Sequence, residues 1–145
     1  MPVLGSPADV RALLARVKTV AVVGLSDDPA RDSHAVAAYL QAAGYRVIPV
    51  NPRAASILGE TSRASLSDIP EAERAAVDLV DVFRRSDAAL EVAREAAALR
   101  LPAIWFQLGV ATPEAIRAAE EAGMDVVSGA CIKTAHQILR PGRTP

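Results

Sequence analysis

Residues 20–33 read VAVVGLSDDPARDS, and this stretch decides the fold class of the sequence. Its first four residues are apolar and three of them are β-branched valines, which is typical of a buried strand. Gly24 ends the strand, a polar turn follows, and a helical pattern begins near Ser33. In α/β folds this arrangement binds phosphates, because backbone N–H groups and the positive end of the helix dipole point at the turn. We interpret the stretch as a cradle for a nucleotide cofactor.

Composition narrows the class of protein. The chain has 145 residues, 51% of them hydrophobic, a net charge of −1 and 3% aromatic residues. This fits one domain with a real core, and neither the charge nor the aromatic content favours nucleic-acid binding. No apolar run is long enough for a membrane span, and the N-terminus lacks the pattern of a signal peptide. With Cys131 as the single cysteine, we expect a cytoplasmic protein without disulfides.

The strand-and-helix alternation continues along the chain. Helices are expected at about 7–17, 34–43, 86–99, 112–122 and 133–139, with an irregular segment and a brief acidic helix between 53 and 76. Strands are expected at 19–23, 46–50, 77–83, 103–107 and 125–128. We therefore predict an α/β fold: a single doubly wound Rossmann-like domain over 1–145, with a five-stranded, mainly parallel sheet in the order 3-2-1-4-5 and helices on both faces. Residues 1–5 and 140–145 are expected to be frayed. Nearly all basic residues are Arg, Asn occurs once and Pro is frequent, which favours a thermophile, although GC-rich coding explains the Arg and Ala content equally well.

Ligands of such sheets bind at the carboxyl ends of the strands. The residues there are mainly Gly, Asn, Gln and Arg, without a histidine, an acidic pair or a metal-binding cluster. This predicts a binding surface and no catalytic residues. Asp78 and Asp81 are expected to accept backbone hydrogen bonds, and His34 and His136 to be structural or solvated. Cys131 is expected to be a buried, inert thiol; the alternative is a mixed disulfide with a ligand thiol under oxidation.

A dinucleotide site does not fit the sequence. Its fingerprint needs three spaced glycines after the first strand and an acidic residue after the second. Here Gly24 stands alone, and Asn51-Pro52 occupies the place of the acid. A Walker A loop is also absent.

Several segments together resemble the small stand-alone CoA-binding domain proteins. These are similar to the N-terminal CoA-binding domain of the succinyl-CoA synthetase alpha subunit. The segments that carry the resemblance are VVGLSDDPARDS (22–33), PVNP (49–52), DLVDVFR (78–84), IWFQLGV (104–110) and the region around Cys131. The sequence departs from the family at Gly129-Ala130-Cys131, where an Asp-Arg-Cys-like sequence is expected.

The resemblance implies coenzyme A as the cofactor. The turn from Gly24 to Asp27 would approach the pyrophosphate, and the arginines would pair with phosphates. Val82 and Phe83 would flank the adenine or the pantetheine, whose amides Gln107 and Gly109 would bind. The expected contact residues are Gly24, Leu25, Ser26, Asp27, Arg31, Ser33, Asn51, Pro52, Arg53, Val82, Phe83, Arg84, Arg85, Gln107 and Gly109.

Simpler roles remain open for some of these residues. Ser33 is better explained as a helix cap than as a ligand contact, and Asn51 is equally explained as the start of an Asx turn before Pro52. The main hypothesis is a module that binds CoA or acyl-CoA without catalytic machinery of its own, with a protein partner or a homo-oligomer left open. The alternatives are an NAD(P)-dependent or acyl-CoA-processing enzyme component completed by a partner chain, and a scaffold that binds nothing.

Overall fold

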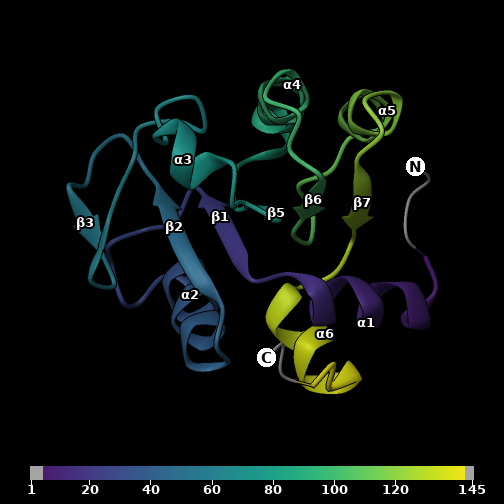
Figure 1. The fold of residues 1–145 in the computed structure, drawn as a ribbon, viewed down its shortest axis with the longest axis horizontal. Helices are drawn as coiled ribbons and strands as arrows, with labels where there is room; N and C mark the ends of the chain where they lie inside the picture. The colour runs from purple at the N-terminus through teal and green to yellow at the C-terminus, as the bar shows by residue number, and fades with distance from the viewer. Residues whose placement is uncertain (1–4, 143–145) are drawn as a thin grey trace.

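The apolar runs of the sequence form one parallel sheet. In the computed structural model, which describes residues 5–142, every neighbouring pair in this sheet is parallel. The strands are β1 (Thr19–Val23), β2 (Arg46–Val50), β5 (Leu79–Val82), β6 (Ala103–Phe106) and β7 (Asp125–Ser128). Helices cover both faces of the sheet (Figure 1). The predicted α/β, Rossmann-like fold class is therefore confirmed.

The predicted order of the strands is wrong. The sheet has the order β2-β1-β5-β6-β7, so the third long strand lies beside β1 and not beyond β2. Pro49 explains why β2 is an edge strand, because proline has no N–H to donate to an outer neighbour. The outer side of β2 is covered by the chain near Arg63, whose N–H donates to the carbonyl of Pro49 at 3.0 Å. β5 occupies an inner position, and all of its residues are buried.

The helices are divided between the two faces of the sheet (Figure 1). α1 (Pro7–Arg16), α2 (Asp32–Ala42) and α6 (Ile132–Leu139) pack on one face. α4 (Ala89–Ala98), which follows a 3-10 turn (Ser86–Ala88), and α5 (Pro113–Glu121) pack on the other. The irregular segment contains a small hairpin, β3 (Ser56–Ile57) with β4 (Glu60–Thr61), and the expected short acidic helix α3 (Glu71–Arg74).

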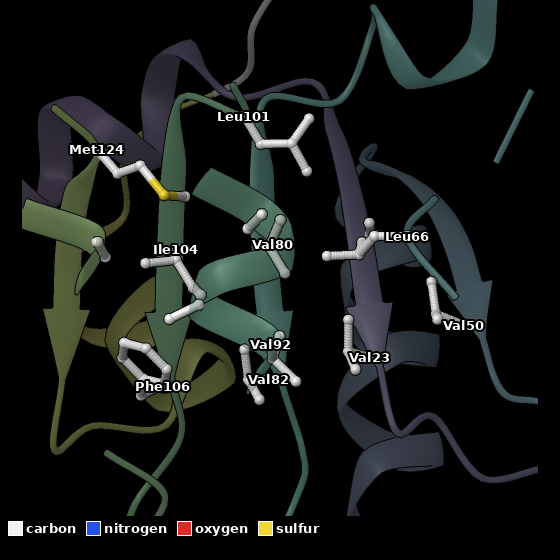
Figure 2. Packing of buried hydrophobic residues seen from close by; sticks show 14 of the residues in the cluster. Val23, Val50, Leu66, Val80, Val82, Val92, Leu101, Ile104, Phe106 and Met124 are labelled. Carbon is white, nitrogen blue, oxygen red and sulfur yellow. The ribbon is translucent and has the colours of Figure 1, made fainter. Parts of the chain in front are cut away.

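Buried side chains form one cluster on each face of the sheet. Figure 2 shows the cluster under α4 and α5, in which Val80 and Val82 of β5 pack with Ile104 and Phe106 of β6. Successive strand residues point to opposite faces, so Asp81 lies on the face of α1, α2 and α6. The fold thereby places a carboxyl group inside an apolar layer.

The chain is anchored close to the last described residue. Arg140 donates its N–H to the carbonyl of His136 at 3.0 Å and accepts a hydrogen bond from Arg11 at 3.2 Å. Residue 140 is therefore hydrogen-bonded to α1 and α6, and fraying of the two ends stays a prediction. Residues 1–4 and 143–145 of the expected frayed ends lie outside the described residues. Among the helices of residues 5–142, none is both long and apolar enough to span a membrane.

Candidate functional site

A cleft of about 750 Å³ lies at the carboxyl ends of β1, β5 and β6. The first turns of α2 and α6 also border it, so two helix N-termini face the same space. Its lining residues are Gly24, Ser26, Ala30, Arg31, Asp32, Ser33, Ala35, Val36, Phe83, Arg84, Gln107, Leu108, Val110, Cys131 and Lys133.

Gly24 is required at the start of the cleft for two reasons. Its φ angle is +85°, in the region that side-chain-bearing residues rarely adopt. A Cβ at this position would also collide with the backbone carbonyl of Phe83. The same Cβ would lie 3.1 Å from Cδ of Arg84. The absence of a side chain at Gly24 therefore lets the loops after β1 and β5 meet and lets Arg84 lie over the turn.

The loop between β1 and α2 is held by its own side chains. The N–H of Ser26 donates to Oγ of Ser33 at 2.9 Å, and Oγ of Ser26 accepts from the N–H of Asp28 at 3.0 Å. Ser33 thus fixes the loop from within the first turn of α2; it is not the N-cap, which is Arg31.

The N-terminus of α2 has free donors. Arg31 makes no side-chain cap hydrogen bond. Across residues 5–142, no acceptor pairs with the backbone N–H groups of Asp32 and Ser33. Free N–H groups at a helix N-terminus bind anions, because the helix dipole adds its positive end to them.

Three cations line the cleft. Arg31 and Arg84 form no ion pair with any described residue, and neither does Lys133. Nζ of Lys133 lies 5.6 Å from the ring centroid of Tyr39, a cation–π distance. Asp32 is the one acid among the lining residues. The cleft therefore carries a net positive charge beside the free N–H groups of α2.

The opposite end of the cleft is formed by Cys131 and Gln107. Oε1 of Gln107 accepts from the N–H of Ile132 at 3.2 Å, which fixes the side-chain amide against the first turn of α6. Partial burial alone would raise the pKa of the Cys131 thiol. Interactions of the thiol with Thr134, Gln107 and Lys133 outweigh burial and lower the pKa below its ordinary value. Cys131 is thus half-buried and lines the cleft, so the expectation that this thiol is buried is wrong.

Asp81 is buried near this cysteine. Both of its carboxylate oxygens lack a hydrogen-bond partner among the described residues, which contradicts the expected pairing with backbone donors. Burial raises the pKa of Asp81 well above its ordinary value, and the negative charge of Cys131 raises it further. Asp78 behaves as expected, because its Oδ2 accepts from the N–H groups of Lys18 and Thr19.

Asn51 has a structural role beside the cleft. Its side-chain amide donates to the carbonyl of Leu25 at 2.9 Å, and its Oδ1 accepts from the N–H of Arg53 at 2.7 Å. The second bond closes an Asx turn around Pro52. Asn51 thus ties the end of β2 to the loop after β1, and both sides of its amide are occupied.

The structure brings together about half of the predicted contact residues. Those in the cleft are Gly24, Ser26, Arg31, Ser33, Phe83, Arg84 and Gln107. Leu25 and Val82 are fully buried in the core. The cleft lining does not include Asp27, Asn51, Pro52, Arg53, Arg85 or Gly109. Prediction from sequence missed Lys133 and Leu108, the latter with 67% of its surface exposed. Leu108 directly follows Gln107, and Lys133 lies two residues after Cys131. This closeness in sequence to two residues after strand ends could have predicted both.

His136 lies outside the cleft, in a cluster of aromatic rings. Its Nδ1 is 2.7 Å from the hydroxyl of Tyr39, and its ring makes edge contacts with Tyr39 and Tyr45. Burial lowers the pKa of His136. The expectation that His136 is structural is consistent with these contacts.

Comparison with known proteins identifies the family of the chain. Residues 18–137 match the family described as CoA binding domain. The chain belongs to this family. The chain is 41% identical to YneT, an uncharacterized protein of Bacillus subtilis (strain 168), over 135 residues. The match covers 93% of this chain and 97% of YneT.

Solved structures extend the comparison of the CoA binding domain. The structure of cell-free ID.343 from Thermus thermophilus has a TM-score of 0.85 and 41% identity, and covers 93% of this chain and 99% of that one. An acetyl-coenzyme A synthetase of Ca. Korarchaeum cryptofilum, in complex with phosphate and ADP, has a TM-score of 0.68 and 25% identity. That match covers 81% of this chain and 26% of the synthetase. The fold thus also occurs as part of a larger acetyl-coenzyme A synthetase.

Proposed function

We propose that this CoA binding domain binds coenzyme A or an acyl-CoA in the cleft at the carboxyl ends of β1, β5 and β6. The observation that carries the proposal is the free N-terminus of α2, which is flanked by the unpaired guanidinium groups of Arg31 and Arg84. Family membership supports the same ligand. The chain would act as a single binding domain of the cytoplasm.

The pyrophosphate would lie over Gly24. At this point no side chain covers the backbone, the N–H groups of α2 are free, and Arg84 crosses the turn. A guanidinium group can donate two parallel hydrogen bonds to phosphate oxygens, so Arg31 and Arg84 would each make a bidentate, charged contact. We assign the 3′-phosphate of the adenosine to Arg53, which lies beyond the cleft lining on the Asx turn after β2.

The pantetheine would run from the phosphates toward Cys131. Phe83, Leu108 and Val110 give this part of the cleft an apolar wall, which suits the methyl-rich pantoate group. Gln107 would bind an amide of the pantetheine through its N–H groups, since its oxygen is already used by Ile132. The sulfur of the ligand would then end near the sulfur of Cys131.

Two matched arginine variants test the proposal. Arg84→Ala removes a cation that lines the cleft, whereas Arg85→Ala removes its exposed neighbour, which does not. Loss of a charged hydrogen bond should weaken CoA binding by about 1.5–3 kcal/mol in Arg84→Ala. Isothermal titration calorimetry should give the native affinity for Arg85→Ala. Equal CoA affinity in the wild type and Arg84→Ala would reject the proposed phosphate site.

A further inference from the structure

The surroundings of the Cys131 thiol, at one end of the cleft, suit a chemical reaction as well as ligand binding. Cys131 is the N-cap residue of α6 and lines the cleft, so its thiol lies beside the N–H groups of the first helical turn, and interactions with Thr134, Gln107 and Lys133 lower its pKa despite partial burial. Donors arranged in this way favour the thiolate, which is the nucleophilic form of cysteine. Because Cys131 also lines the cleft, a thiolate at this position faces the bound ligand.

Gln107 gives the site a second chemical feature. Its side chain is 6% exposed and its oxygen is held by the N–H of Ile132, so its amide nitrogen is turned toward Cys131. Among residues 5–142 the amide nitrogen has no hydrogen-bonded acceptor, so its N–H groups are available to a ligand atom. The backbone N–H of Cys131 itself donates to no described residue. A side-chain amide and a backbone N–H beside a nucleophile are the parts of an oxyanion hole.

Asp81 is a second, independent observation that favours a functional site near Cys131. Its carboxyl is completely buried, neither oxygen has a partner within residues 5–142, and it lies close enough to Cys131 to sense the thiolate charge. Burying a polar group without a partner is costly, so each such group needs an explanation, and a catalytic or ligand-binding role is one of them. Burial and the nearby Cys131 both raise the pKa of Asp81 and so favour its neutral form, which places no second negative charge beside the sulfur.

We propose that Cys131 is an acyl acceptor, which takes the acyl group from a CoA thioester held in the cleft and carries it as a protein thioester. The inference rests on the proposed binding of CoA. The thiolate of Cys131 attacks the thioester carbonyl, and the N–H groups of Gln107 and Cys131 stabilise the tetrahedral oxyanion. The bond from the carbonyl carbon to the CoA sulfur then breaks, and CoA leaves with the electron pair as a thiolate. One thioester replaces another, so no oxidant or reductant is consumed.

The test follows the mass of the intact full-length protein during incubation with acetyl-CoA under anaerobic conditions. We expect the mass of one acetyl group to be added, to map to Cys131 and to be removed by neutral hydroxylamine, which cleaves thioesters. Free CoA should appear in equal amount. Cys131→Ser should gain no hydroxylamine-sensitive adduct, and wild-type protein blocked with iodoacetamide should behave in the same way if that variant does not fold.

The variant Gln107→Glu tests the role of the Gln107 N–H groups in the reaction while it preserves the size of the side chain in the cleft. Glutamate keeps an oxygen for the N–H of Ile132 but offers no N–H to an oxyanion. The rate of acetylation at saturating acetyl-CoA should fall by ~10²-fold or more, as for loss of an oxyanion-hole donor. Arg85→Ala, on the exposed surface beside the cleft, should be acetylated at the native rate.

Calorimetry on the same wild-type preparation distinguishes the possible failures. If CoA binds but no acetyl adduct forms, acyl transfer is rejected and the proposed function stands. If CoA does not bind, both are rejected. An adduct with the mass of CoA that dithiothreitol removes is a mixed disulfide, and it would reject acyl transfer while supporting CoA in the cleft.

Discussion

The side-chain amide of Asn51 donates a hydrogen bond of 2.9 Å to the backbone carbonyl of Leu25. This contact joins the end of β2 to the loop that follows β1. It places the loop that carries Gly24 and Ser26 against the edge of the sheet, so the shape of the cleft depends on a residue that does not line it.

Asn51→Ala should therefore weaken both the fold and the ligand site. It removes the bonds to the carbonyl of Leu25 and to the N–H of Arg53, which together are worth about 1–3 kcal/mol. Urea unfolding should report this loss, and calorimetry should report weaker CoA binding. Asn51→Asp keeps the acceptor for Arg53 but loses the donor to Leu25. If it binds CoA as tightly as the wild type, the loop does not depend on the bond to Leu25.

Gly24→Ala should be more destabilising than the same change at Gly109. Both glycines have positive φ angles, +85° and +75°, so each variant loses about 1–2 kcal/mol to the left-handed backbone. At Gly109 the added methyl group meets nothing within 4 Å, whereas at Gly24 it meets the carbonyl of Phe83. The free energy of unfolding should fall further in Gly24→Ala. Equal losses in the two variants would show that the loops after β1 and β5 move apart without cost.

Asp81→Asn should stabilise the protein at neutral pH. The pKa of Asp81 is raised in the folded state, so the folded protein binds this proton more tightly than the unfolded chain. The wild type thus loses stability as the pH rises from the unfolded pKa of about 4 toward the raised pKa, by about 1.4 kcal/mol for each pH unit between the two. An asparagine does not titrate and avoids this loss.

Urea unfolding of both proteins at several pH values checks this prediction. The two stabilities should converge near pH 4 and separate as the pH rises. Cys131→Ser removes the thiolate that helps to raise the pKa of Asp81, so the stability of that variant should depend less steeply on pH. A constant difference between wild type and Asp81→Asn at all pH values would contradict a raised pKa at Asp81.

Arg53→Ala tests where the 3′-phosphate lies. If Arg53 binds this phosphate, the variant should lose about 1.5–3 kcal/mol of CoA affinity and keep its affinity for dephospho-CoA. The calorimetric titrations of both ligands into wild type and variant form a thermodynamic cycle. Parallel losses for the two ligands would place Arg53 elsewhere along the cofactor or away from it.

Local sequence patterns were sufficient for the fold class and for the centre of the site. Valine-rich strands followed by helices predict a parallel sheet, and a glycine after β1 predicts a phosphate turn at the carboxyl ends. Both features are determined by residues that are neighbours in the sequence. The order of the strands is not, because the crossover after β2 can place the next strand on either side of β1. Pro49 contained the relevant information, since a proline within a strand indicates an edge.

The rest of the site depends on contacts between distant segments. Cys131 meets Gln107 only because the chain after β7 returns beneath β6, where Nε1 of Trp105 donates to the carbonyl of Ala130 at 2.9 Å. Asp81 resembles a strand-end residue in the sequence, but the central position of β5 buries it. Arg53 and Arg85 also follow strands, yet their side chains are exposed away from the cleft lining, and a rule based on strand ends does not separate them from Arg84.

The most direct test of the central claim is calorimetric titration of the wild-type protein with CoA, dephospho-CoA and NAD under the same conditions. The positively charged cleft predicts saturable binding of one CoA per chain, weaker binding of dephospho-CoA and no saturable binding of NAD. Binding of NAD with an affinity equal to that of CoA, or no saturation with CoA, would contradict the account.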